Sequence, residues 1–226
     1  MTFSVEAQHI SMIYQSSAGQ KVQALDDISF QIPSSTWAAL AGSSGSGKSS
    51  LLHILGGLLT PTGGSLEITG FALHAASSNE RSAFRLRNVG FVFQAFYLLP
   101  HLRAWENVAL PLIAAGEKPK ERKERAFQLL DEVGLAGRYH HRPAELSGGE
   151  QQRVALARAI VHHPAVILAD EPTGNLDAAS AKLVLDILEN FVRQGATVIC
   201  ATHDPKVTNR ADQVIQLEQG KIVSHV

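Results

Sequence analysis

A glycine-rich segment between an apolar run and a helical stretch constrains this chain more than any other feature. The segment consists of Gly42, Ser43, Ser44, Gly45, Ser46, Gly47, Lys48 and Ser49. It fits the pattern G-x-x-x-x-G-K-[ST]. Trp37–Ala41 before it predicts a strand buried on both faces, and Lys48–Leu59 predicts a helix. A strand, a glycine loop and a helix in this order are typical of a loop that wraps phosphate groups.

The residue types in this loop suit an anion. Small residues let backbone N–H groups curl around phosphate oxygens, and the following helix directs its positive end at the same anion. Lys48 supplies a cation to β- and γ-phosphates, and the Ser49 hydroxyl can bind Mg²⁺. The alternative is a plain glycine-rich strand–helix turn, but the buried strand before it and the helix after it favour the phosphate loop.

Two carboxylates follow a second buried strand. Ala165–Ala169 predicts that strand, and Asp170 and Glu171 come directly after it. The carboxyl end of a strand is where open α/β sheets bind ligands. We expect Asp170 to hold hydrated Mg²⁺, directly or through water, and Glu171 to orient and deprotonate an attacking water. The alternative is a pair of solvated surface acids at a strand end.

The rest of the chain alternates between strand and helix patterns, which predicts an α/β fold with a parallel sheet and helical crossovers. Further strands are predicted at Ile28–Ile32, Leu66–Phe71, Val89–Phe93 and Ala196–Ala201, and a hairpin at Asp212–Val223. Further helices are predicted at Trp105–Ala115, Pro119–Val133, Ser147–Val161 and Ala178–Arg193.

Composition excludes several classes of protein. The 226 residues suit one domain, and a net charge of −1 argues against a chain that binds nucleic acid mainly by charge. The charged run 118–125 is interpreted as a solvated helix face. Cys200 is the only cysteine, so no intramolecular disulfide or cysteine zinc site is expected, and a reducing compartment fits. Neither a secretory signal nor a membrane-spanning apolar run is expected.

A third motif comprises Leu146, Ser147, Gly148, Gly149 and Glu150. A serine and two glycines that open a helix can form a second anion-binding helix N-terminus. Ser147 with Glu150 three residues later is also an ordinary capping box. The local pattern does not separate these two interpretations.

Taken together, the motifs give the sequence a resemblance to the ATPase subunits of ABC transporters over essentially its whole length. The matching motifs, in the family's order, are the phosphate loop Gly42–Ser49, the glutamine Gln94, the signature Leu146–Glu150, the acidic strand Val166–Asp170 with Glu171, the D-loop Gly174–Asp177 and the switch histidine His203. Tyr14 matches the aromatic residue on which the family stacks adenine. Ser50 stands where threonine is common, and Glu150 where glutamine is frequent.

Within that family the chain is most similar to the lipoprotein-release, macrolide-efflux and cell-division ATPases. The residues that carry this similarity are 93–100, 106–108 and 171–177. The aromatic stretch Phe96–Pro100 could otherwise be plain core of a helical lobe.

The resemblance implies a P-loop NTPase core with a parallel sheet, an N-terminal antiparallel β subdomain and an inserted α-helical subdomain. Residues 1–226 would form one ABC-type ATPase domain. Residues 1–93 and 164–226 would make up the β subdomain and catalytic core, and residues 94–163 the helical subdomain with the signature.

The resemblance also implies ATP and Mg²⁺ as ligands. The residues implied in ATP binding are Tyr14, the eight residues of the phosphate loop, Ser50, Gln94 and Asp170. Mg²⁺ would be held by Ser49, Gln94 and Asp170. Lys48, Glu171 and His203 would be catalytic, with Glu171 acting on the water and His203 contacting the γ-phosphate.

Two copies would pair head to tail, so that each ATP meets Lys48 of one copy and Ser147–Gly149 of the other. Asn175 and Asp177 would lie at the dimer contact. Gln94 would sense the γ-phosphate beside the surface that receives a membrane partner. ATP would drive this dimerisation, and hydrolysis would release it.

The expected partner is an integral membrane permease on another chain, which places this chain at the cytoplasmic face of the inner or plasma membrane, with no nucleic acid as a partner. One alternative is a nucleotide-gated regulatory subunit of a cell-division complex. A soluble ABC ATPase that acts on DNA or ribosomes is disfavoured, because residues 49–146 show no sustained heptads and the chain holds one ATPase domain. A small-molecule P-loop kinase would explain neither the signature nor His203.

Overall fold

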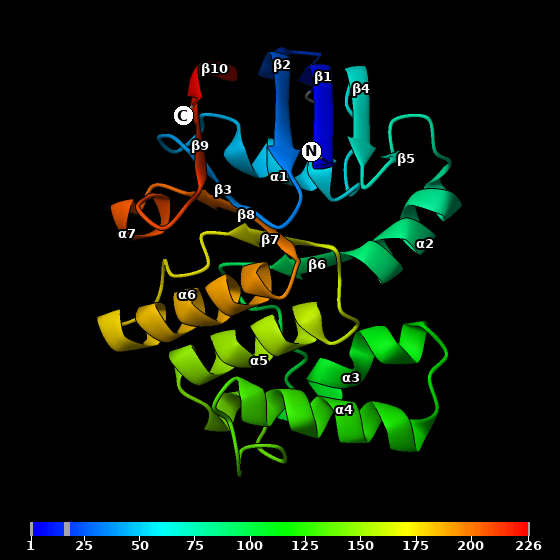
Figure 1. The fold of residues 1–226 in the computed structure, drawn as a ribbon, viewed down its shortest axis with the longest axis vertical. Coiled ribbons are helices and arrows are strands. Elements are labelled where there is room, and N and C mark those ends of the chain that lie inside the picture. The colour runs from blue at the N-terminus through cyan, green and yellow to red at the C-terminus, as the bar shows by residue number, and fades with distance from the viewer. Residues whose placement is uncertain (1, 16–18, 226) are drawn as a thin grey trace.

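The computed structural model describes residues 2–15 and 19–225, which form stacked layers (Figure 1). The upper layer in Figure 1 is an antiparallel sheet with strand order β2-β1-β4-β5. Its strands are β1 (Phe3–Gln15), β2 (Lys21–Pro33), β4 (Gly63–Ile68) and β5 (Phe71–Ala72). The antiparallel sheet expected at the N-terminal side is therefore confirmed. The strand predicted at Leu66–Phe71 begins three residues earlier and is interrupted by a turn at Thr69 and Gly70.

The middle layer is a six-stranded sheet with order β10-β9-β3-β8-β7-β6. Its strands are β3 (Trp37–Ala41), β6 (Val89–Val92), β7 (Val166–Asp170), β8 (Thr197–Thr202), β9 (Gln213–Glu218) and β10 (Lys221–His225). Neighbours from β9 to β6 are parallel, and β10 closes the edge as an antiparallel hairpin with β9. The predicted parallel sheet and the C-terminal hairpin are both confirmed.

The central strands β3, β7 and β8 are buried on both faces, as their apolar sequences predict. Alternate residues of β7 take part in different cores: Val166 and Leu168 pack toward the antiparallel sheet, and Ile167 and Ala169 pack toward the helices on the other side. A strand with both faces buried is held tightly, so the residues at its carboxyl end have well-defined positions.

Helix α1 (Lys48–Leu55) contributes four buried apolar residues to the core between the two sheets. It ends four residues earlier than predicted. Gly57 adopts a left-handed φ of 64°, and its N–H donates to the carbonyl of Ile54 at 2.9 Å. Glycine accepts this conformation without a steric penalty, which closes the helix at this point.

The lower layer in Figure 1 consists of helices. They are α3 (Ala104–Ala114), α4 (Pro119–Glu132), the short 3₁₀ helix η1 (Pro143–Glu145), α5 (Gly148–Ile160) and α6 (Ala178–Arg193). The four predicted helices match α3 to α6 within one residue at each end. Because α3, α4 and α5 all lie between β6 and β7 in the chain, they form an insertion between two paired strands.

Two α-helices, as well as the short 3₁₀ helix η1, were not predicted from the sequence. Helix α2 (Ser78–Asn88) begins with a capping box in which Ser77 and Glu80 exchange hydrogen bonds, a pattern visible in the sequence. Helix α7 (Pro205–Thr208) is a single turn after β8. No helix in residues 2–15 and 19–225 combines the length and apolar character needed to cross a membrane.

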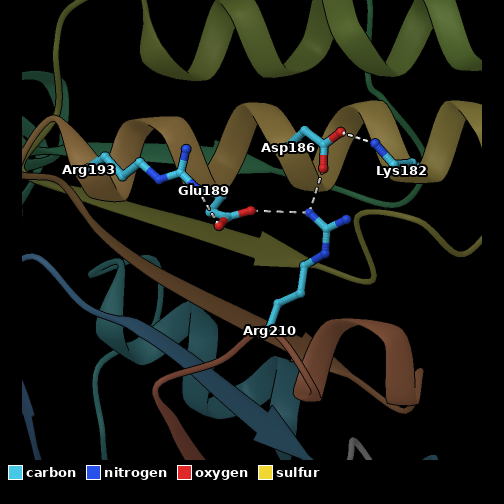
Figure 2. A network of polar contacts seen from close by, with 5 residues as sticks. All are labelled: Lys182, Asp186, Glu189, Arg193 and Arg210. Carbon is cyan, nitrogen blue, oxygen red and sulfur yellow. Dashed lines mark hydrogen bonds and ion pairs between the residues drawn. The ribbon is translucent and has the colours of Figure 1, made fainter.

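A network of ion pairs ties α6 to the segment after α7 (Figure 2). Arg210 Nη1 lies 2.7 Å from Asp186 Oδ1 and 3.4 Å from Glu189 Oε2. Lys182 and Arg193, both on α6, complete the network at 2.8 Å from Asp186 and 2.7 Å from Glu189. The hydrogen bonds from Lys182 and then Arg210 lower the pKa of Asp186. The network fixes the residues after β8 against the helix that begins at the D-loop.

Candidate active site

One cleft of about 570 Å³ gathers most of the predicted site residues. It lies at the carboxyl ends of β3, β7 and β8 and falls in the size range of small-molecule sites. Its lining residues are Ala24, Ser43, Ser44, Gly45, Gly47, Lys48, Ser49, Ser50, Gln94, Asp170, Glu171 and His203. Ala24 is the only one of these that the sequence did not single out.

Gly42 and Ser46 belong to the predicted loop but do not line this cleft. Gly42 adopts a φ of 152°, and a Cβ on it would lie 2.3 Å from the carbonyl oxygen of Leu217. Ser46 is 2% exposed, and its hydroxyl has no hydrogen-bond partner among the described residues. These two residues shape the base of the loop, where only a residue without a side chain fits at position 42.

Lys48 begins α1 and is 7% exposed. Its Nζ donates to the carbonyl oxygens of Gly42 at 2.8 Å and Ser43 at 2.9 Å. An ammonium group has three donors, so one remains for an anion in the cleft. The residue before the helix, Gly47, is its N-cap, with a φ of 105° and no capping hydrogen bond from a side chain of the described residues. Its first N–H groups are therefore also open to an anion.

Glu171 follows β7 in a left-handed conformation with φ 45°, which is uncommon for a residue with a side chain. Its N–H donates to the carbonyl of Ala201 at 2.9 Å. Its Oε1 lies 2.7 Å from Nδ1 of His203, and its Oε2 accepts a hydrogen bond of 3.2 Å from Oγ1 of Thr202. The carboxylate is thus held by two consecutive residues at the end of β8. Its side chain is 15% exposed, whereas that of His203 is 73% exposed.

The three residues expected to hold a metal all line the cleft. Ser49, Gln94 and Asp170 offer a hydroxyl, an amide and a carboxylate, the oxygen donors that Mg²⁺ prefers. Gln94 also packs on the D-loop, because a Cβ on Gly174 would lie 3.1 Å from its Nε2. These three donors fit Mg²⁺. One of them, Gln94, also lies against Gly174, so the expected metal site is next to the D-loop.

Tyr14 lies at the end of β1, 38% exposed, and does not line the cleft. Its hydroxyl is 3.1 Å from Oγ of Ser50 in the first turn of α1. The ring therefore lies beside the start of the helix that follows the phosphate loop. Adenine stacking on this ring stays a prediction.

The signature segment forms the capping box that its sequence allows. Oγ of Ser147 accepts from the N–H of Glu150 at 3.2 Å, and Oε2 of Glu150 accepts from the N–H of Ser147 at 2.8 Å. Arg138 Nε donates to Oε1 of Glu150 at 2.9 Å. The hydrogen bond from the Ser147 N–H is the main reason that the pKa of Glu150 lies below its usual range. The described cleft lining includes no residue of 146–150.

The two signature glycines differ in their surroundings. A Cβ on Gly149 would lie 2.3 Å from Oγ of Ser180 on α6, so the contact between α5 and α6 requires glycine there. A Cβ on Gly148 would meet no described residue within 4 Å. Leu146 differs again, because its side chain is 6% exposed and packs in the core with the helices. Its side chain therefore anchors the segment, and Ser147 and Gly148 form the exposed part.

Asp177 caps α6. Its Oδ1 accepts from the N–H groups of Ala179 and Ser180 at 3.0 Å each, and its Oδ2 accepts from Oγ of Ser180 at 2.6 Å. The Ser180 side chain is the main reason that the pKa of Asp177 is lowered. Asn175, two residues before Asp177, is exposed to solvent. Neither Asn175 nor Asp177 lines the cleft.

A model of the family described as ABC transporter matches residues 25–174. The chain belongs to the ABC transporter family. As a member of this family it is an ABC ATPase.

Curated relatives of this ABC ATPase cover nearly all of its length. The lipoprotein-releasing system ATP-binding protein LolD of Bordetella avium is 44% identical over 97% of this chain and 96% of its own. The macrolide export ATP-binding/permease protein MacB of Sodalis glossinidius is 45% identical over 97% of this chain. This chain spans only 34% of the length of that MacB protein.

Solved structures give the same fold. The ATP-binding cassette MJ0796, solved as a dimer in a post-hydrolysis state bound to ADP and Pi, superposes with a TM-score of 0.92. It is 35% identical, and the match covers 98% of this chain and 97% of that one. A second dimeric structure of MJ0796, described as an ABC transporter cassette, matches equally well.

Thr202 of this ABC ATPase contacts the Glu171 carboxylate and was not among the residues predicted from the sequence. A signal was present, because a polar residue ends an otherwise apolar strand directly before His203. The side chain of Thr202 is fully buried, and nothing in the sequence alone shows that its partner lies 31 residues away.

Proposed function

We propose that this ABC ATPase binds ATP between two copies of itself and that the resulting closure powers a separate membrane permease of the lipoprotein-release or macrolide-efflux type. Export, extraction of a lipid-anchored protein and transmission of force across the membrane all use this same cycle. The LolD and MacB relatives support this placement within the family.

One observation carries the proposal: the groups for one nucleotide are split between two surfaces of the same chain. Lys48, Asp170 and Glu171 line the cleft, and the exposed Ser147–Gly148 helix end does not. A Cβ on Gly148 would also meet no described residue of the same chain within 4 Å, so no contact within one copy requires glycine there. A head-to-tail pair with two-fold symmetry brings each Ser147–Gly148 surface to the cleft of the other copy.

Residues of this chain supply the binding chemistry. The N–H groups of Gly42–Ser49 and the start of α1 surround the phosphates, and the third donor of the Lys48 ammonium contacts the β- and γ-phosphates. When bound, Mg²⁺ on Ser49, Gln94 and Asp170 neutralises charge on the phosphate oxygens. ATP binds the closed pair better than the open one, so nucleotide shifts the equilibrium toward closure.

Glu171 then acts on the attacking water. Within the described part of the chain each of its oxygens has one partner, and a carboxylate accepts about four hydrogen bonds, so either oxygen can also accept from a water. The water oxygen bonds to the γ-phosphorus, its proton passes to Glu171, and the bond from the γ-phosphorus to the β–γ bridging oxygen breaks to leave ADP and phosphate. His203 holds the water and the γ-phosphate from the exposed side.

A surface beside Gln94 suits the permease. A largely apolar groove of about 450 Å³ is lined by Phe93, Tyr97 and Pro111, among others, and Tyr97 is 65% exposed. Arg158 donates to the carbonyls of Phe96 and Tyr97 at 2.6 Å each, which fixes this edge of the groove. A permease helix bound there would contact the segment that follows Gln94.

The test combines nucleotide binding with identification of the partner. The tagged chain is purified from membranes of its source cell, and the membrane protein that accompanies it is identified by mass spectrometry. A permease with an extracytoplasmic domain is expected, whose presence alters ATP turnover. Lys48→Ala should weaken binding of a labelled nucleotide, and Lys120→Ala on exposed α4 should not. Recovery with ribosomes or nucleic acid, and with no permease, would refute the membrane role.

A further inference from the structure

We propose that Thr202 is a positioning residue for hydrolysis: its buried hydroxyl holds the Glu171 carboxylate in the orientation that accepts the proton of the attacking water. The inference deepens the proposed function, since it rests on Glu171 as the base. The geometry that carries it is the placement of one hydroxyl between Glu171 and the backbone of Asp204.

The direction of the hydroxyl proton follows from counting donors. The N–H of Asp204 donates to Oγ1 of Thr202 at 2.9 Å, and a backbone N–H can only donate. The hydroxyl is therefore the acceptor in that bond. Its single proton remains for Oε2 of Glu171 at 3.2 Å, and an ionised carboxylate can only accept. Both bonds are satisfied at once only when the proton of Thr202 faces Glu171.

The sheet fixes both partners. Thr202 is fully buried at the end of β8, where it is paired with Ala41 of β3. On the other side, Asp170 of β7 is paired with Ala201, and the N–H of Glu171 donates to Ala201. A β-branched side chain on such a strand has few alternative rotamers. The hydroxyl therefore belongs to a well-ordered strand of the sheet and not to a loop.

The second partner of the carboxylate is held less firmly. The side chain of His203 is 73% exposed, and its proposed role is to contact the γ-phosphate. A histidine that turns toward the phosphate gives up part or all of its contact with Oε1 of Glu171. Thr202 is then the partner that keeps the carboxylate in place, because its hydroxyl has no route to solvent. A carboxylate free to rotate would meet the water in the correct geometry less often.

The experiment compares two substitutions that differ by one hydroxyl. Thr202→Val keeps the shape and removes the hydrogen bonds, and Thr202→Ser restores the hydroxyl. ATP turnover is measured with Mg²⁺ across ATP concentrations on the full chain. We expect Thr202→Val to lower kcat about tenfold with KM for ATP within about twofold of the original, and Thr202→Ser to recover most of kcat.

Two control variants distinguish a role of Thr202 in orienting Glu171 from an unspecific loss of folded structure. Thr197, at the other end of β8, is also fully buried, and its Oγ1 bonds to Oγ of Ser4 at 2.7 Å and accepts from the N–H of Ser35 at 3.0 Å. Thr197→Val therefore removes an equally buried hydroxyl from the same strand, away from the cleft. Thr208→Val removes a threonine hydroxyl from α7, where Oγ1 donates to the carbonyl of Pro205 at 3.2 Å, and leaves Thr202 and Asp204 unchanged.

Both controls should keep kcat within about twofold of the original chain. The proposal is overturned if Thr202→Val keeps full kcat, if its loss lies in KM, if serine fails to rescue it, or if either control loses as much. Glu171→Gln, measured in parallel, tests the proposed function separately. If Glu171→Gln keeps full turnover, Glu171 is not the base and the proposed function itself fails in this respect. If Glu171→Gln loses turnover but Thr202→Val keeps it, Glu171 remains the base and only the positioning role of Thr202 is excluded.

Discussion

Nδ1 of His203 lies 2.7 Å from Oε1 of Glu171, although the two residues are 32 positions apart in the sequence. The pair sits at the carboxyl ends of two neighbouring parallel strands, β7 and β8, in the same cleft as Lys48. The carboxylate proposed as the base is therefore in contact with an exposed imidazole. Because the imidazole is the more exposed partner, it can turn toward a ligand while the carboxylate stays in the cleft.

Glu171→Gln should remove hydrolysis and keep nucleotide binding. The amide has nearly the size of the carboxylate but cannot take up a proton from water, so turnover should fall by about 10² or more. ATP with Mg²⁺ should then trap a dimer, measured by light scattering beside phosphate release. A variant that hydrolyses ATP at the original rate would exclude Glu171 as the base.

The two signature glycines give a matched pair of substitutions. Gly149→Ala should lower the free energy of unfolding by about 1–3 kcal/mol, because its methyl group would displace Ser180 from the cap of α6. Gly148→Ala should leave stability unchanged and weaken ATP-driven dimerisation, because its methyl group points into the space proposed for the partner's ATP. Urea unfolding and light scattering measure the two effects, and normal dimerisation of Gly148→Ala would contradict the assigned surface.

Tyr14→Ala should cost about 1–3 kcal/mol in ATP affinity if the ring stacks on adenine. Tyr14→Phe is the control, because it keeps the ring and removes only the hydroxyl that contacts Ser50. Titration with a fluorescent adenine nucleotide should show near-original affinity for phenylalanine and reduced affinity for alanine. Equal affinities for all three proteins would place the adenine elsewhere.

Arg210→Met should lower the free energy of unfolding by about 1 kcal/mol, because it removes the ion pairs between α6 and the segment after α7 (Figure 2). Arg193→Met is the control, since among the residues that the structure describes Arg193 pairs only with Glu189 on the same helix. Its effect should stay within about 0.5 kcal/mol. Equal losses for both variants in urea unfolding would show that the link between elements adds nothing.

Cys200 should resist thiol reagents in the folded chain. Burial raises the pKa of its thiol from an ordinary value of 9.0 to about 12, so almost no reactive thiolate forms at about pH 8. Labelling should be complete only after unfolding in urea. The unfolded thiol ionises first as pH rises from about 9 toward 12, so this group lowers stability across that interval. Rapid stoichiometric labelling of the native protein would show that β8 opens readily.

Much of the site could be predicted because its motifs are local. The phosphate loop lies between a strand and a helix that are adjacent in the chain, and glycine is needed where φ is positive, as at Gly47. The same holds for Asp170 and Glu171, which simply end an apolar strand. The missed helix α2 was also local, since Ser77 and Glu80 form a recognisable capping box.

The sequence by itself determined which segments become strands and helices and which residue types stand at their ends, because period, backbone sterics and capping act over a few residues. Only the tertiary structure decided which of these ends meet. It placed β8 beside β7 and so brought Thr202 and His203 to Glu171. It also left open space beside Gly148 and placed Ser180 so that a Cβ on Gly149 would lie 2.3 Å from its Oγ, although both positions are glycine and adjacent in the chain. Such contacts depend on the packing of segments far apart in the chain, and no local pattern records them.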